Sequence, residues 1–255
     1  MKAKVNGTEL YYELHGSEGA PWLIFSHSLA CTVRMWDPQI AAFKDRYRIL
    51  AYDMRGHGQS AAPAGPYTLE MLADDVLALM KELRIQRARY VGLSIGGMIG
   101  QHLALKEPGR FERMVLADTG HAQTPETLKQ WDERIRIAQA QGMKPLVAGT
   151  MERWFTPAFR ESPQAKRIAE LIAATPVAGY VGCGQAIMKL NTTARLKDIK
   201  LPVLAITGEA DAAAAGTRYI GEHIPGAKFV NIPQAAHIAN IEQAEKFNQV
   251  LRDFL

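Results

Sequence analysis

Cysteine is scarce in this sequence: its 255 residues include two, Cys31 and Cys183. Two cysteines cannot build a disulfide framework, and their separation fits no metal-binding spacing. The sequence therefore predicts neither a disulfide-stapled protein nor a cysteine-ligated metal site. A reducing compartment is the usual place for such a chain, so we expect it to be cytoplasmic.

Long apolar runs and clusters of like charge are also missing. No apolar stretch approaches the ~20 residues that a helix needs to cross a bilayer. Residues 1–7 lack the hydrophobic core of a signal peptide. The net charge is +4, and the lysines and arginines are scattered. We expect no membrane or nucleic-acid partner; the oligomeric state stays open.

The sequence does have the composition and periodicity of an α/β protein. Hydrophobic residues make up 47% and charged residues 22%, which is ordinary for a globular domain with a large core. Apolar runs predict buried strands at 22–25, 47–52 and 111–117. Residues 68–83 repeat apolar side chains at spacings of three and four, which predicts a helix. This alternation predicts a mostly parallel, doubly wound sheet.

The pattern changes in residues 121–193. Helical segments there are broken by glycine and proline, and no buried strand is evident. Strand character returns at 202–207. We therefore predict a core domain of residues 1–120 and 194–255, with a helical cap of residues 121–193 inserted in it.

A serine motif lies where a strand meets a helix. Gly92-Leu93-Ser94-Ile95-Gly96 fits G-x-S-x-G, which can also occur by chance in a loop. The context favours the nucleophile elbow, because a β-branched apolar strand precedes Ser94 and a helix over 95–105 follows it. The helix N-terminus would direct free N–H groups at the reacting oxygen.

A serine nucleophile needs a base, and the base needs an acid that orients it. In elbow-bearing folds the chain order is Ser, Asp or Glu, then His. His237 lies in a loop between the last strand and the last helix, where a base would stand above the sheet. By contrast, His102 falls inside a helix and His223 on a charged helix face. We predict His237 as the base.

Three residues are candidates for the acid. Asp211 follows the strand that ends near residue 207, which is the usual place. Asp118 follows the strand after the elbow helix and stays the alternative. Glu209 is interpreted as a loop residue. These groups should converge with Ser94, because the carboxyl ends of parallel strands meet at one edge of a sheet.

An oxyanion hole needs two backbone N–H groups. One belongs to Ile95, the residue after the nucleophile. The other comes from the loop after an early strand, and we assign it to Leu29. His27 lies in that loop; we interpret it as a residue that holds the loop, and the alternative is a second base.

No cofactor or metal is expected. The turn at residues 53–60 contains two glycines but lacks the G-K-[ST] ending of a phosphate loop. The glycines at 92–97 have the wrong spacing for a dinucleotide fingerprint.

The motifs together resemble the α/β-hydrolase superfamily over nearly the whole chain; they are His27-Ser28, Asp53–Ser60, Gly92–Gly97, Gly208–Asp211 and Ala236-His237. Within it, the sequence is most similar to the 3-oxoadipate enol-lactonases, through residues 34–39, 52–58, 63–68, 92–101 and 152–157. That family opens a small unsaturated lactone in bacterial aromatic-ring degradation. The resemblance implies a fold with a helical cap and a triad of Ser94, Asp211 and His237.

The cap and the loops near the elbow should supply substrate contacts, although aromatic side chains are more often core and arginines more often solvated surface. A guanidinium fits a substrate carboxylate bidentately. The candidates are Trp36, Trp131, Trp154, Phe155 and Met98 for an apolar wall, and Arg34, Arg134 and Arg153 for a carboxylate.

Two loops depart from the enol-lactonase pattern. Residues 27–30 read His-Ser-Leu-Ala where that family has Asn-Ser-Leu-Gly, and residues 212–216 are Ala-Ala-Ala-Ala-Gly in place of a Pro-Ala-Thr-Pro type loop. We predict a serine hydrolase of small esters or lactones, with 3-oxoadipate enol-lactone as the first candidate. The alternatives are a general carboxylesterase, a perhydrolase or haloperoxidase-like enzyme, a C–C bond hydrolase, and a non-catalytic receptor.

Overall fold

The computed structural model describes all 255 residues and contains one eight-stranded sheet. Its strand order is β1-β2-β4-β3-β5-β6-β7-β8. The pairs β1–β2 and β2–β4 are antiparallel, and all other neighbours are parallel. The strands are β1 (Lys2–Val5), β2 (Thr8–His15), β3 (Trp22–Ser26), β4 (Arg48–Tyr52), β5 (Ala88–Leu93), β6 (Phe111–Ala117), β7 (Val203–Gly208) and β8 (Lys228–Ile232).

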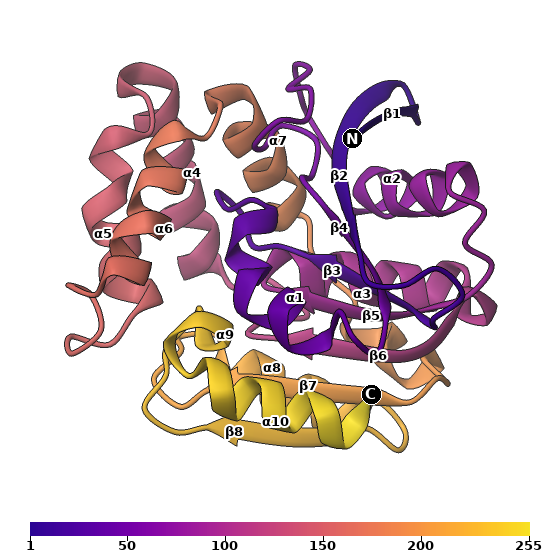
Figure 1. Cartoon of the computed structure of the whole chain (residues 1–255). Coiled ribbons are helices and arrows are strands. Elements are labelled where there is room, and N and C mark those ends of the chain that lie inside the picture. The colour runs from indigo at the N-terminus through magenta and orange to yellow at the C-terminus, as the bar shows by residue number, and fades with distance from the viewer.

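Helices cover both faces of the sheet, with α1 and α10 on one face and α2, α3 and α8 on the other (Figure 1). The α-helices are α1 (Asp37–Phe43), α2 (Leu69–Glu82), α3 (Ile95–Lys106), α4 (Pro125–Gln141), α5 (Val147–Trp154), α6 (Pro163–Ala174), α7 (Val177–Met188), α8 (Ala214–His223), α9 (Ala239–Glu242) and α10 (Ala244–Phe254). The 3₁₀ turns are η1 (Val33–Trp36), η2 (Pro108–Arg110), η3 (Lys144–Leu146) and η4 (Thr193–Asp198).

Local sequence accounts for several element boundaries. The hairpin between β1 and β2 turns at Asn6 and Gly7, which both have positive φ angles of 46° and 70°, as a type I′ turn requires. The Thr68 hydroxyl accepts the Met71 N–H at 3.0 Å and so caps the start of α2. These two signals fix the first strand pair and one of the helices that pack beneath the sheet.

The central parallel strands form the core. Every residue of β7 is buried, as is nearly every residue of β3, β4 and β5. Strands buried on both faces carry continuous apolar runs, which is why the sequence signalled them clearly. Their carboxyl ends lie along one edge, and the loops that follow them are brought together there.

The four helices α4 to α7 fall between β6 and β7 and are grouped to one side of the sheet (Figure 1). We call residues 121–193 the cap segment. An antiparallel bridge pairs Ala122 with Asn191, so the two ends of the segment lie side by side. The division into a core of residues 1–120 and 194–255 and this cap stays a prediction.

One close contact joins the cap segment to the core. Gly179 in α7 lies against Gly56 in the turn after β4, and a Cβ atom on Gly179 would stand 1.9 Å from the Gly56 carbonyl oxygen. Gly56 also has a φ of 81°, which favours glycine. Any side chain at either position would push α7 away from the sheet.

No single helix is long and apolar enough to span a membrane. The pair α6 and α7 reaches that length and composition only together, and it bends by 97° at the break between the two helices.

Candidate active site

Ser94 occupies the turn between β5 and α3 with a strained backbone. Its φ and ψ are 58° and −117°, a conformation that non-glycine residues rarely adopt. The Ser94 N–H donates to the Ala117 carbonyl at 2.8 Å, and the Ser94 carbonyl accepts the Thr119 hydroxyl at 2.8 Å. These two bonds, one to the last residue of β6 and one to the segment that follows it, hold the turn in place.

Two glycines allow this turn to form. A Cβ atom on Gly92 would stand 2.2 Å from the Gly96 carbonyl oxygen, and one on Gly96 would stand 2.2 Å from the Ser26 carbonyl oxygen. Strand β5, helix α3 and the end of β3 therefore meet at backbone distance. The G-x-S-x-G spacing is the sequence expression of this close approach.

Asp211 and His237 form a hydrogen-bonded pair. The distance from Asp211 Oδ1 to His237 Nδ1 is 3.0 Å, and Asp211 Oδ1 also accepts the Ala213 N–H at 3.1 Å. Burial raises the pKa of Asp211, but the charge and hydrogen bond of His237 outweigh burial and hold the pKa below its ordinary value. This shift favours the ionised carboxylate, which is hydrogen-bonded to the imidazole.

One cavity of about 610 Å³ brings Ser94, Asp211 and His237 together. The cavity lies between the sheet edge and the cap segment. No hydrogen bond joins the side chains of Ser94 and His237, although both line the cavity. Catalytic hydrogen bonds are often long in unliganded sites and tighten with bound substrate.

The residues predicted for the oxyanion hole lie beside this cavity. Leu29 lines it, and the Leu29 N–H has no acceptor in the protein. The next residue, Ala30, has a φ of 56° and donates its N–H to His57 Nε2 at 3.0 Å. Ile95 is buried and is the first residue of α3, so its N–H has no intrahelical acceptor.

His27 is fully buried below the Leu29 loop. Its Nε2 accepts the Met54 N–H at 2.9 Å, and its Nδ1 donates to the Ser28 carbonyl at 2.7 Å. Burial lowers the pKa of His27 to about 4, so the ring is neutral near pH 7. Both ring nitrogens bond to backbone, which supports the interpretation of His27 as a residue that holds the loop.

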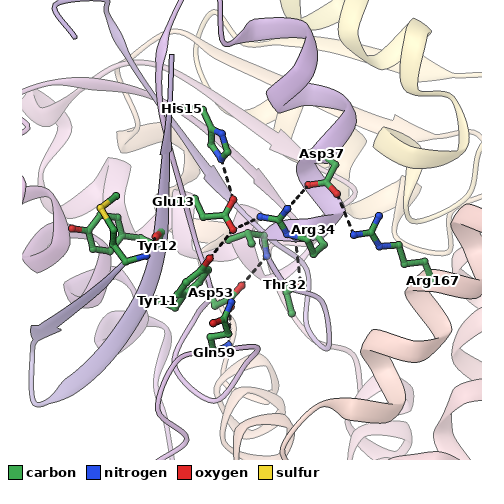
Figure 2. Close-up of polar contacts among 12 residues, drawn as sticks. Tyr11, Tyr12, Glu13, His15, Thr32, Arg34, Asp37, Asp53, Gln59 and Arg167 are labelled. Atoms are coloured by element: carbon green, nitrogen blue, oxygen red, sulfur yellow. Dashed lines mark hydrogen bonds and ion pairs between the residues drawn. The ribbon is translucent and has the colours of Figure 1, made fainter. Parts of the chain in front are cut away.

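The structure corrects the expectation that Arg34 contacts the substrate. Arg34 is not among the residues that line the cavity; its guanidinium pairs with Glu13 of β2 and with Asp37 at 3.3 Å (Figure 2). Asp37 in turn pairs with Arg167 of α6 at 3.5 Å. Arg34 therefore belongs to an ion-pair chain on the outside of the fold, because Glu13, distant in sequence, lies next to it.

Trp36 is also displaced from its expected role. Its side chain is fully buried in the core, with its ring stacked on Phe25 at a centroid distance of 4.8 Å and tilted against Phe247 at 6.4 Å. Phe155 is likewise buried and lies outside the cavity lining. These aromatic residues pack the fold and do not form the cavity wall.

The other predicted contacts do reach the cavity. Trp154 lies close to the imidazole of His237, with ring centroids 5.7 Å apart. The cavity lining also includes three aromatic residues that the sequence analysis missed. Of these, His121 could have been found from the sequence, because it comes three residues after Asp118 at a strand end. The predicted lining residues are Met98, Trp131, Trp154, Arg134 and Arg153, and the missed ones are His121, Tyr180 and Tyr219.

Glu242 is a further residue that the sequence did not reveal. Its carboxylate accepts the Ala236 N–H at 2.8 Å and the Thr156 N–H at 3.0 Å. The Ile238 N–H also donates to the Trp154 carbonyl at 3.2 Å. Glu242 thus ties the loop that carries His237 to the end of α5 in the cap segment.

Comparison with known families agrees with this architecture. Residues 21–244 match the family described as alpha/beta hydrolase fold. The chain belongs to the α/β-hydrolase family. This confirms the predicted fold class and, at the level of the family, the prediction of a hydrolase.

Relatives of this hydrolase cover nearly all of it. It is 37% identical over 95% of its length to 3-oxoadipate enol-lactonase 2 of Acinetobacter baylyi, of which it covers 91%. It is 28% identical over 96% of its length to a putative carbamate hydrolase RutD of Stutzerimonas stutzeri, of which it covers 96%. A crystal structure of the enol-lactonase from Burkholderia xenovorans LB400 matches with a TM-score of 0.95 and 40% identity, covering 100% of this chain and 99% of that one. The resemblance to enol-lactonases is confirmed.

Proposed function

We propose that this hydrolase cleaves a small carboxylic ester or lactone through an acyl-enzyme on Ser94, and that 3-oxoadipate enol-lactone is its substrate. The observation that carries the proposal is the strained Ser94 turn, which opens on the same cavity as the Asp211–His237 pair. The enol-lactonases of Acinetobacter baylyi and Burkholderia xenovorans support the choice of substrate.

In the first half-reaction, Ser94 Oγ attacks the carbonyl carbon while His237 Nε2 takes its proton. The Leu29 and Ile95 N–H groups hydrogen-bond the tetrahedral oxyanion, and each such donor typically contributes about 10²–10³ in rate. The ring C–O bond then breaks, and His237 returns the proton to the leaving oxygen. Asp211 stabilises the imidazolium that forms in between.

In the second half-reaction, His237 takes a proton from water, which attacks the acyl carbon and releases Ser94. A lactone keeps its leaving group tethered beside the acyl-enzyme, so re-closure competes with water. In an enol-lactone the released enol converts to a ketone, which is no longer a nucleophile. This chemistry favours hydrolysis over re-closure.

The cap segment supplies the proposed apolar contacts. Trp131 of α4 and Trp154 of α5 face the cavity together with Met98 of α3. Trp154 also lies beside the His237 ring. We propose that these three side chains exclude water from the acyl group and orient the lactone ring over Ser94.

Arg134 and Arg153 are the proposed partners of a substrate carboxylate. Both line the cavity, and Asp211 is its one acidic lining residue. Arg134 donates to Gln130 at 3.1 Å and Arg153 to Thr150 at 3.1 Å, so neither is neutralised by an acid. Burial lowers the pKa of Arg153, and the nearby charge of Arg134 lowers it further. An anionic substrate group would relieve this repulsion.

A general carboxylesterase is the second candidate function. It is favoured by the loop after Asp211, where Ala212, Ala213, Ala215 and Gly216 make a smooth apolar wall. The relative named putative carbamate hydrolase RutD shows that proteins similar over the same length are assigned other hydrolase activities. A cytoplasmic location also stays part of the proposal, consistent with the two free, buried cysteines.

The decisive experiment compares three substrates: 3-oxoadipate enol-lactone, a simple γ-lactone and a short p-nitrophenyl ester, each with wild type and Ser94→Ala. We expect the enol-lactone to have the highest kcat/KM, and all turnover to depend on Ser94. A preference for the ester would establish the carboxylesterase alternative. Failure of a serine-directed phosphonate to label Ser94 would instead leave a non-catalytic receptor.

The carboxylate contacts have their own test. Arg134→Gln and Arg153→Gln should each raise KM for the enol-lactone about tenfold, because one charge-assisted hydrogen bond is lost. The neutral p-nitrophenyl ester should be unaffected. Arg136→Gln is the matched control, since Arg136 lies on α4, is exposed and pairs with Glu133. Equal KM changes for the charged and neutral substrates would contradict a carboxylate subsite.

A further inference from the structure

Asp118 is a buried carboxyl group that the proposed mechanism does not use. It directly follows β6, has no exposed surface, and adopts a φ of 47° in the left-handed region. Strain of this kind at a non-glycine residue persists only where surrounding contacts impose it, and it is frequent at functional sites. The contacts of its two carboxylate oxygens indicate what the residue does.

The two oxygens of Asp118 have different environments. Oδ1 accepts the Gly208 N–H at 2.7 Å, whereas Oδ2 is buried and receives no donor. Asp211 is arranged in the same way: Oδ1 serves His237 and Ala213, and Oδ2 is buried without a donor. Gly208 holds both residues at the same strand end: its N–H donates to Asp118 Oδ1 at 2.7 Å, and its carbonyl accepts the Asp211 N–H at 3.1 Å. The pKa of each carboxyl group is shifted by the other.

Two neighbouring buried carboxyl groups disfavour ionisation of both, because each would present only acceptors and a negative charge to the other. A single proton shared between Asp118 Oδ2 and Asp211 Oδ2 would give each of these buried oxygens a hydrogen-bond partner. Burial and the charge of Asp211 raise the pKa of Asp118 well above its ordinary value, while His237 keeps the pKa of Asp211 low. The proton therefore resides on Asp118.

We propose that Asp118 is a neutral carboxylic acid that donates its Oδ2 proton to Asp211 Oδ2 and so acts as a positioning residue for the triad. The proposal rests on the triad of the proposed function. With this bond Asp211 is held by three groups, which are His237, the Ala213 N–H and Asp118. Its carboxylate cannot rotate away from the imidazole, and the pair carries one negative charge rather than two.

The remaining groups that face Asp118 are the Gly208 N–H and the Thr207 hydroxyl of β7, and neither titrates near neutral pH. The titratable groups in this direction are Asp211 and, beyond it, His237. A change in the pH profile after substitution of Asp118 would therefore reflect a changed pKa of Asp211 or His237.

Two substitutions separate a proton donor from an ionised neighbour. In Asp118→Asn the amide oxygen can accept the Gly208 N–H and the amide N–H can replace the donated proton. We expect its kcat/KM to stay within about threefold of wild type. Asp118→Leu removes the donor, and we expect kcat to fall about tenfold or more, because a hydrogen bond to a charged group is lost.

The pH profile gives a readout that folding alone would not change. Without the donor, Asp211 carries its full negative charge, so His237 holds its proton to higher pH. The acidic limb of kcat/KM should therefore move to higher pH in Asp118→Leu and stay in place in Asp118→Asn. If Asp118 were ionised, both variants would lose a negative charge near His237. The acidic limb of kcat/KM would then move to lower pH in Asp118→Asn as well as in Asp118→Leu. That outcome would overturn the proposal.

Infrared spectroscopy keeps the proposal testable even if Asp118→Leu does not fold. The wild type minus Asp118→Asn difference spectrum should contain the C=O stretch of a protonated carboxyl group at pH 7. Its absence, with only a carboxylate band lost, would also overturn the proposal. Because this measurement needs no turnover, it is independent of the proposed substrate; loss of Ser94 dependence in the substrate panel would be a separate failure.

Discussion

Two clusters that contain histidine and aspartate lie along the same edge of the sheet, and they differ in where their polar atoms find partners. In the first, His27 and His57 bond to backbone groups through both ring nitrogens, and Asp53 accepts the N–H groups of Val33 and Gln59. In the second, His237 bonds to the side chain of Asp211 and faces the cavity that Ser94 also lines.

The first cluster supports the backbone, whereas the second faces the cavity in which we propose the reaction takes place. The histidines of the first cluster are buried and neutral: burial lowers the pKa of His27 to about 4 and that of His57 to about 3. All of its hydrogen bonds fix backbone, including the loop that presents the Leu29 N–H. The second cluster leaves a reactive nitrogen and a hydroxyl free in a cavity. Both clusters contain histidine and aspartate, but only the second has free hydrogen-bonding groups that face a cavity.

The largest effect should come from His237→Ala. We expect kcat to fall by roughly 10⁴-fold or more, because the general base is removed and only the oxyanion donors remain. The thermal midpoint should change little, since the imidazole contributes one hydrogen bond at a cavity wall. Steady-state kinetics and a thermal melt on the same sample test this. If His237→Ala kept a tenth of the wild-type activity, His237 could not be the general base that distinguishes the second cluster from the first.

His27→Ala should produce the opposite pattern. We expect a loss of about 2–4 kcal/mol in the free energy of unfolding, because the Met54 N–H loses its acceptor and a core cavity opens. Urea unfolding measures this loss. The kcat of the folded fraction should stay within about tenfold of wild type. A loss of kcat as large as that of His237→Ala would assign His27 to the chemistry.

The buried His27 of the first cluster should also make the free energy of unfolding depend on pH. The pKa of His27 in the folded state, about 4, lies below its unfolded value near 6.5. The unfolded chain therefore binds more protons, and stability present above pH 6.5 is lost as the pH falls toward 4. This contribution is on the order of 3 kcal/mol. Urea unfolding between pH 4 and pH 7 should be flatter in His27→Ala, and an identical slope would contradict a neutral buried ring.

Ala30→Gly should have the smallest effect. Ala30 adopts a φ of 56°, which glycine tolerates and alanine does not favour. We expect an increase in stability of about 0.5–1 kcal/mol, or roughly 2–3 °C in the thermal midpoint. Activity should be unchanged, because the Ala30 N–H to His57 bond does not depend on the side chain. A lower midpoint would show that the buried methyl group outweighs the strain.

The local parts of the site could be predicted from sequence. The elbow at Ser94 is a short motif with a strand before it and a helix after it, so neighbouring residues carry the signal. His237 follows from chain order and from its place between the last strand and the last helix. The bounds of the central strands were found because strands buried on both faces have continuous apolar runs.

Contacts between distant segments could not be predicted. Arg34 and Trp36 failed as substrate contacts because their partners, Glu13, Phe25 and Phe247, come from other parts of the chain. Position in the chain favoured Asp211 over Asp118 as the acid, but it could not show that the two are neighbours; that depends on the packing of β6 beside β7. Helical periodicity likewise gives no information on how cap helices face one another.

The bridge between Ala122 and Asn191 has a consequence for protein engineering and for the evolution of this scaffold. The chain leaves and re-enters the sheet at adjacent points, so helices α4 to α7 can be replaced as one cassette without lengthening any loop of the core. A transplanted cassette would need a glycine against Gly56 and an N–H group for Glu242. The lining of the cavity can then diversify by exchange of a single gene segment while Ser94, Asp211 and His237 stay in place on the sheet.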